Sequence, residues 1–260
     1  MKKIIGLFLA IAMVLSMVSC GSATSSKAFE LSKQAYENIN AAYDKVDVFS
    51  HDIYEAWYQG INNKDNIDGT YTSYYSTRYD DSTALTNFAN KLHISKADLE
   101  AAVAKLLGKS EYNPGSEYSR GDWYTLSHIA YSSFFSACVD VVSTAYELNG
   151  SADSIIALLE EARTNMKQLS ASYSDYEHYP NLKEYFTTTT AFFGFCLEPE
   201  GSFDQVVDTF NNYRNDARNY YYDLNYVFED AIFPKDDEDK KEENGEETSG
   251  SDIVGETTGV

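Results

Sequence analysis

The chain has 260 residues, with 41 acidic side chains against 20 basic ones and a net charge of −21 at pH 7. Because nucleic acids and anionic lipid headgroups are bound chiefly through Lys and Arg, this charge excludes a nucleic-acid-binding protein. Aromatic residues make up 15% of the chain, which supplies both a large core and an amphipathic, partly wet surface.

The first 19 residues have the pattern of a secretory leader. Lys2 and Lys3 precede an apolar run over residues 4–18, which matches the charged and hydrophobic regions of a signal peptide. The run is shorter than the roughly 20 apolar residues that a permanent transmembrane helix needs. We therefore expect residues 1–19 to be a targeting segment that is removed.

The leader ends in MVSC, residues 17–20. This stretch resembles the lipobox of bacterial lipoproteins, with Met17 in a position where Leu is usual. The resemblance implies that Cys20 carries a lipid and that residues 20–25 tether a domain to the outer side of a cell membrane. Two acyl chains make a durable anchor, whereas one chain binds reversibly. The alternative is an ordinary signal peptide cut nearby, which leaves Cys20 as a free or disulfide-bonded thiol.

Residues 26–234 are predicted to form one domain built from helices. Apolar residues recur with 3,4 spacing, small alanines allow close helix approach, and no stretch alternates at period two over several strands. The expected helices are 26–61, two short helices within 82–107, 120–148, one that starts at Ser151, one that starts at Pro180, and 203–233. The fold class is therefore all-α, an elongated bundle of about four long helices with a short helical pair inserted between the first and the second.

The stretch QAYENINAAYDKV, residues 34–46, adds a second resemblance. Together with the chain length and the lipid signal, it is similar to the YiiG-like helical lipoproteins of unknown function. That resemblance implies a helical, lipid-anchored protein and assigns no site residues.

The stretch NNKDNIDGTYTSYYSTRYDD, residues 62–81, links two predicted helices and is far longer than a minimal turn. Long ordered loops in compact domains often carry function. Tyrosine rings stack on flat ligands while neighbouring amides and carboxylates bond hydroxyl groups, which suits a glycan or an envelope protein. The alternative is that the tyrosines only pack over the ends of the bundle. The candidate ligand-binding residues are Tyr71, Tyr74, Tyr75, Arg78 and Tyr79.

No catalytic residue and no cofactor site are predicted. Residues 108–110, Gly-Lys-Ser, lack the first glycine of a P-loop and follow a helix, so they are interpreted as a helix C-cap. Residues 65–69 resemble half of a calcium-binding loop but lack the first and twelfth ligands of an EF-hand, so an EF-hand is excluded. An irregular cation-binding loop is the alternative to a loop without a ligand.

No metal site is predicted either. His51 with Glu55 and Asp175 with His178 have spacings that suit a metal ion. Two ligands on an exposed face are weak evidence, so we interpret both as solvated pairs.

Cys138 and Cys196 remain as an even pair when Cys20 is lipidated. Both fall on apolar helix faces. They form a possible disulfide in an oxidising exterior if their Cα atoms come within about 7 Å, and are otherwise buried free thiols.

Residues 235–260 contain three Lys against ten Asp and Glu. The segment has too few apolar side chains to offset its ordering entropy, so a disordered acidic tail is expected.

The sequence predicts a lipid-anchored extracytoplasmic binding or scaffolding protein of the bacterial cell envelope that is not an enzyme. Its expected partners are the membrane, through lipid on Cys20, and a glycan or envelope protein. The alternative is an envelope enzyme that acts on glycan or peptide through loop carboxylates. Paired acids with shifted pKa values in a concave pocket favour the enzyme, and an exposed aromatic patch without them favours the binding protein.

Overall fold

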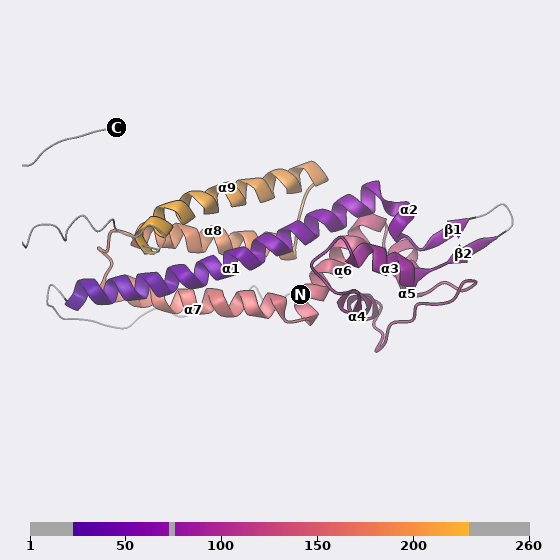
Figure 1. Cartoon of the computed structure of the whole chain (residues 1–260), viewed down its shortest axis with the longest axis horizontal. Coiled ribbons are helices and arrows are strands. Elements are labelled where there is room, and N and C mark those ends of the chain that lie inside the picture. The colour runs from indigo at the N-terminus through magenta and orange to yellow at the C-terminus, as the bar shows by residue number, and fades with distance from the viewer. Residues whose placement is uncertain (1–22, 73–75, 229–260) are drawn as a thin grey trace, which may run out of the picture. The chain divides into compact units, whose positions relative to one another are not determined.

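The computed structural model describes residues 23–72 and 76–228, and these ranges are mostly helical (Figure 1). The predicted all-α class is confirmed. The elements in chain order are α1 (Ala23–Asn62), α2 (Lys64–Ile67), β1 (Thr70–Thr72), β2 (Thr77–Tyr79), α3 (Asp81–Ala89), α4 (Lys96–Leu106), α5 (Asp122–Thr125), a π-helical turn (Leu126–Ala130), α6 (Phe134–Leu148), α7 (Ser151–Ser172), α8 (Tyr179–Leu197) and α9 (Phe203–Phe228). Predictions about residues 1–22, Tyr74, Tyr75 and 229–260 lie outside the described residues.

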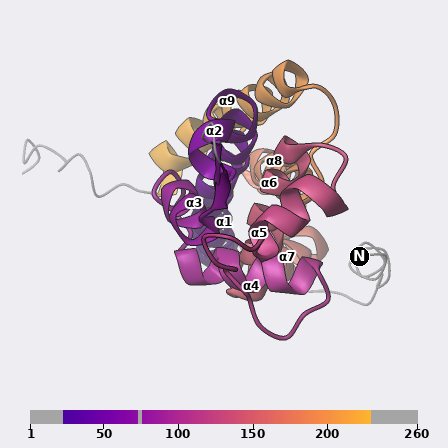
Figure 2. The same ribbon diagram turned by 90° about the vertical axis from the view of Figure 1, so that its right-hand side faces the viewer.

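Helix α1 is the central element of the bundle. Its 40 residues correspond to about 60 Å of helix, and it packs against α6, α7, α8 and α9. In Figure 2, which looks along the helices, α9 lies above α1 and α7 lies below it. The predicted apolar seam faces these partners, because Ala35, Ile39, Val46 and Phe49 are fully buried. The small alanines of this seam let neighbouring helices approach closely.

Two apolar cores divide the bundle along its length. One joins the first part of α1 to α8, α9 and the end of α7, with Tyr36 and Tyr185 among its largest buried side chains. The other joins the second part of α1 to α3, α4, α5 and α6, and contains Trp123 and Phe88. Many of the tyrosines therefore serve the core. Within the described ranges no helix is both long and apolar enough to cross a membrane.

The short inserted pair is confirmed as α3 and α4. The Asp80 carboxylate accepts from the backbone N–H of Thr83 at 2.9 Å and caps α3. The predicted cap of α4 is present, since Ser95 accepts from the N–H of Asp98 at 3.2 Å. Such caps satisfy backbone donors that have no partner within the helix.

The predicted helix over 120–148 is wrong in one respect, because the chain leaves the helical path at residues 131–133. Tyr131 and Ser133 have extended backbones, and α6 begins afresh at Phe134. The indole of Trp123 is fully buried and donates to the carbonyl of Ile67 at 2.6 Å. This bond fixes α5 against the end of α2, and the π-helical turn and the extended residues separate α5 from α6.

Candidate functional site

The tyrosine-rich stretch forms a small antiparallel hairpin where an irregular loop was expected. Strands β1 and β2 pair Thr70 with Tyr79, Tyr71 with Arg78 and Thr72 with Thr77. Threonine and tyrosine favour strands because β-branched and aromatic side chains fit a pleated surface. The stretch was too short to show several cycles of alternation, which is why the sequence did not reveal the strands.

The base of the hairpin is fixed at both ends. Gly69 has a positive φ of 73°, a conformation that glycine adopts without steric cost. The Asp68 carboxylate accepts from the N–H of Thr70 at 2.7 Å, and the N–H of Asp80 donates to the carbonyl of Gly69 at 2.8 Å. The strands therefore leave the helical body in a defined direction.

A second segment, the loop between α4 and α5, is bonded to the hairpin. The N–H of Tyr79 donates to the carbonyl of Glu117 at 3.0 Å. The guanidinium of Arg78 forms an ion pair with the Glu117 carboxylate at 2.6 Å. A tight turn with two backbone bonds between Ser116 and Ser119 forms the tip of the loop. Sequence reasoning did not include this loop, because about 40 residues separate it from the tyrosines.

A hollow of about 610 Å³ opens where the two segments meet. We call its lining the hairpin surface: Tyr71, Arg78, Tyr79, Asp80, Ser82, Pro114, Gly115, Ser116 and Glu117. Three of the predicted ligand-binding residues thus line one hollow, whereas Tyr74 and Tyr75 lie outside the described residues. Tyr71 is 54% exposed. The surface combines an aromatic ring, a guanidinium, carboxylates and hydroxyls within one concave area.

Tyr79 is held in place by aromatic and cationic neighbours. Its ring meets the ring of Tyr124 edge to face, with centroids 5.1 Å apart. Arg120 lies over Tyr124 at 4.8 Å and over Tyr79 at 5.8 Å, and its Nε donates to the Tyr79 hydroxyl at 3.3 Å. Stacking of a guanidinium on aromatic faces is favourable even at exposed sites. Tyr79 is therefore a fixed wall of the hollow, while the more exposed Tyr71 presents its ring to solvent.

Two buried carboxylates anchor the loop beneath the hairpin surface. Asp81 is fully buried and accepts from the N–H of Tyr124 at 3.1 Å. Asp122 forms an ion pair with Lys109 and accepts from the N–H of Asn113 at 2.9 Å. Together these contacts tie both ends of the α4–α5 loop to the body.

Asp81 and Asp122 differ in how completely their carboxylate oxygens are hydrogen-bonded. The Oδ1 atom of Asp81 has no hydrogen-bond partner among the described residues. Burial raises the pKa of Asp81 from 3.8 to about 6, the nearby charge of Asp122 adds to the rise, and backbone N–H groups oppose it. Neither acid lines the hollow, so this pair serves to hold the loop and is not placed to act on a bound molecule.

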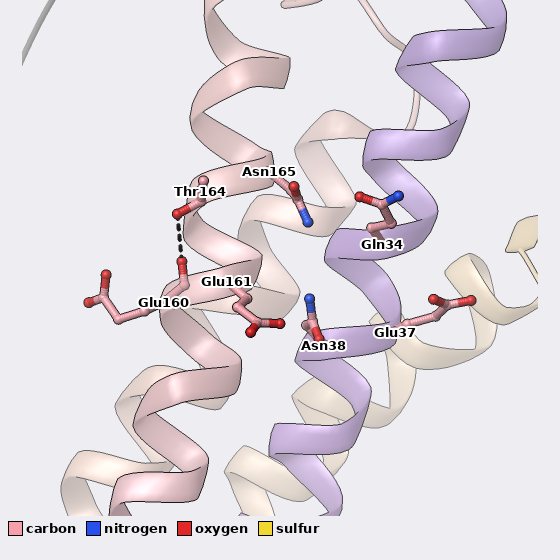
Figure 3. A pocket seen from close by; sticks show the side chains of 7 residues that line it. All are labelled: Gln34, Glu37, Asn38, Glu160, Glu161, Thr164 and Asn165. Atoms are coloured by element: carbon pink, nitrogen blue, oxygen red, sulfur yellow. Dashed lines mark hydrogen bonds between the residues drawn. The ribbon is translucent and has the colours of Figure 1, made fainter.

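A second hollow of about 540 Å³ lies between α1 and α7 (Figure 3). In Figure 3, Gln34 and Asn38 of α1 face Glu161 and Asn165 of α7. Glu37 and Glu160 point away from the groove, and Thr164 donates to the carbonyl of Glu160 at 2.9 Å. Among the residues that the structure describes, no aromatic ring lines this groove. It offers amides and carboxylates without a stacking face, so the hairpin surface is the stronger candidate for ligand binding.

The remaining predicted positions have structural surroundings. Cys138 and Cys196 are free, fully buried thiols in the structure. Burial raises the pKa of both thiols above the ordinary range, so the reactive thiolate is disfavoured. Gly108 has a positive φ of 69° just after α4, as a C-cap requires. The next residue, Lys109, forms an ion pair with Asp122.

The two histidine–carboxylate pairs considered from spacing are not formed as expected. Glu55 accepts from Gln59 at 3.0 Å, and His51 lies near Asp52 instead. His178 has Glu177 as its ion-pair partner at 3.2 Å.

Comparisons with protein-family models, with curated proteins and with solved structures gave no match to this chain. A function must therefore be argued from the residues and their geometry.

Proposed function

We propose that the protein is a lipid-anchored, extracytoplasmic binding protein of the bacterial envelope, and that its hairpin surface binds a glycan. The observation that carries the proposal is an exposed tyrosine, Tyr71, at the edge of a hollow that also holds Arg78 and Glu117. The resemblance of residues 17–20 to a lipobox supports the proposed location on the outer side of the membrane.

The chemistry of the hairpin surface matches that of a sugar. A sugar ring has an apolar face of C–H groups, which packs on an aromatic ring, and hydroxyls that both donate and accept hydrogen bonds. Tyr71 offers the aromatic face, Arg78 offers donors, and Glu117 offers acceptors. The hydroxyl of Ser116 does both.

The ion pair at this surface is available to a ligand. The Arg78 and Glu117 side chains are about half exposed, and exposed pairs contribute only about 0–1 kcal/mol to stability. Replacing the ion pair by hydrogen bonds to ligand hydroxyls therefore costs the protein little stability. By contrast, the bonds from Tyr79 to the loop keep the backbone fixed, and a preorganised site loses less entropy on binding.

The alternative of an envelope enzyme draws no support from the hairpin surface. Its catalysis requires carboxylates that reach the substrate. Two carboxylates do line the hairpin surface, but Asp80 caps α3 and Glu117 pairs with Arg78. The nearby acid whose pKa is raised to about 6, Asp81, is fully buried and bonded to the backbone of α5.

A glycan array probed with the full chain in detergent micelles tests the proposal. We expect binding to a subset of glycans, and a roughly 5-fold loss in Tyr71→Ala because stacking on an aromatic ring contributes about 1 kcal/mol. Arg78→Ala should weaken the same signals. Tyr222→Ala is the matched control, because Tyr222 is also an exposed tyrosine, 62% accessible, but lies on α9. Identical profiles for all four chains would contradict the proposal.

A further inference from the structure

A second cluster of reactive side chains lies on another part of the molecule. Asp52 of α1, His51 beside it and His93 in the turn between α3 and α4 converge on one point. Their ligand atoms all lie within 4.8 Å of one another. The cluster shares no residue with the hairpin surface.

The carboxylate at the centre is buried and held firmly. Asp52 is fully buried. Its Oδ2 accepts from the hydroxyl of Tyr146 at 2.9 Å, and the N–H of His93 is shared between Oδ1 at 3.0 Å and Oδ2 at 3.1 Å. Tyr146 is itself fixed, because its ring stacks on Phe49 with centroids 4.0 Å apart. These donors orient the carboxylate so that Oδ1 is the oxygen that both imidazoles approach.

Both imidazoles present the same nitrogen to that oxygen. The Nδ1 of His93 lies 2.8 Å from Asp52 Oδ1, and the Nδ1 of His51 lies 3.8 Å from it. The two rings meet edge to face with centroids 5.4 Å apart. Around half of each imidazole is exposed, so the open side of the cluster faces solvent.

We propose that Asp52, His51 and His93 bind a transition-metal dication of the zinc type. Zinc is held at about 2.0–2.2 Å by nitrogen and oxygen ligands, so ligand atoms around a tetrahedral ion lie about 3.4 Å apart. The two distances of 2.8 and 3.8 Å bracket that value. The exposed His51 side chain closes the remaining gap by a small rotation, and water from the open side supplies a fourth ligand.

The donor set selects the class of metal. Imidazole nitrogen suits zinc, copper and nickel, whereas calcium and magnesium take oxygen ligands. The Tyr146 hydroxyl and the His93 backbone N–H act as the outer bonds that orient a ligating carboxylate and commonly accompany such sites. Spacing along the sequence paired His51 with Glu55 and missed this arrangement, because His93 lies 41 residues beyond Asp52.

The cluster also has a structural role that a test must separate from metal binding. Asp52 joins α1 to the α3–α4 turn through the backbone of His93. Removal of Asp52 therefore leaves buried donors without a partner and threatens folding. The two exposed imidazoles are the better targets, since their removal keeps the backbone bonds to Asp52.

The experiment is a calorimetric titration of the full chain in detergent micelles with Zn²⁺, alongside His51→Ala and His93→Ala. The matched control is His178→Ala, which removes an imidazole that faces the exposed carboxylate of Glu177. We expect one Zn²⁺ per chain, at least about 10-fold weaker binding in each of the two cluster variants, and unchanged binding in the control. Circular dichroism of every variant checks that it is folded.

A second readout separates this site from loose adhesion of zinc to an acidic surface. Co²⁺ bound to the wild-type chain should give the intense visible absorption of a four-coordinate ion, and His93→Ala should lose it. Equal Zn²⁺ affinity in all four chains would overturn the proposal. So would a wild-type chain that binds no Zn²⁺, or a loss of binding confined to His178→Ala.

Discussion

Asp81→Asn should stabilise the protein at pH 7 but have a much smaller effect at pH 4. In the folded chain the Asp81 carboxyl is buried, its Oδ1 lacks a partner among the described residues, and its pKa is raised from 3.8 to about 6. Between these two values the folded state binds a proton that the unfolded state has lost. Stability therefore falls as pH rises through this window.

The size of the effect follows from the same values. Each pKa unit corresponds to about 1.4 kcal/mol, so ionising the buried Asp81 disfavours the folded state by about 3 kcal/mol above pH 7. Roughly 2 kcal/mol of this should appear between pH 4 and pH 7, since at pH 4 the unfolded state is already partly ionised while the folded state is still protonated. Asparagine has almost the same shape and keeps an oxygen that accepts from the N–H of Tyr124.

Urea unfolding of both full chains at pH 4 and pH 7 measures the prediction. Acids far from Asp81 contribute equally in the two chains, so the difference between the chains isolates Asp81 and its interaction with the neighbouring Asp80 and Asp122. The advantage of Asp81→Asn should grow by about 2 kcal/mol from pH 4 to pH 7. Parallel stability profiles would refute the assignment of the raised pKa to this group.

Three further predictions concern packing, location and the metal cluster. Gly60→Ala should destabilise the protein by about 1–3 kcal/mol, because a Cβ there would lie 2.7 Å from a backbone carbon of α6. Gly194→Ala should stabilise it by up to about 1 kcal/mol, because a Cβ there would meet no atom of the described residues within 4 Å. Equal melting temperatures of the two variants would contradict this account of helix contact. Cys20→Ala should move the protein from the membrane fraction to the soluble fraction, and unchanged membrane retention would refute the lipid anchor. Tyr146→Phe should weaken Zn²⁺ binding about 10-fold by removing a hydrogen-bond donor to the ligating carboxylate of Asp52. An unchanged Zn²⁺ affinity in this variant would show that the Tyr146 hydroxyl does not orient that carboxylate.

Helix positions were predictable where a single physical signal extended over many residues. The seam of α1, seen in Ala35, Ile39 and Val46, repeats over several turns and is buried as expected. The boundary between two helices was equally predictable, because Gly150 takes the left-handed conformation that ends one helix and begins the next.

The features that sequence reasoning missed depend on contacts between distant segments. The break at residues 131–133 has no proline or glycine to mark it, and the bond that fixes the preceding helix α5 joins Trp123 to Ile67, 56 residues away. The hairpin surface depends on the ion pair between Glu117 and Arg78, which lie far apart in the sequence. The buried Asp52 lies off the α1 seam, and its partner His93 lies in the turn between α3 and α4, 41 residues further along the chain. The spacing of apolar residues indicates which face of a helix is buried. It does not indicate which polar group from a distant part of the chain contacts that helix.

Amide hydrogen exchange of the full chain with and without the strongest glycan of the array tests directly where a ligand binds. The account predicts slower exchange in residues 70–72, 76–82 and 113–120, and no change in α7 or α9. Protection confined to the groove between α1 and α7, or no protection anywhere, would contradict the claim that the hairpin surface is the binding site.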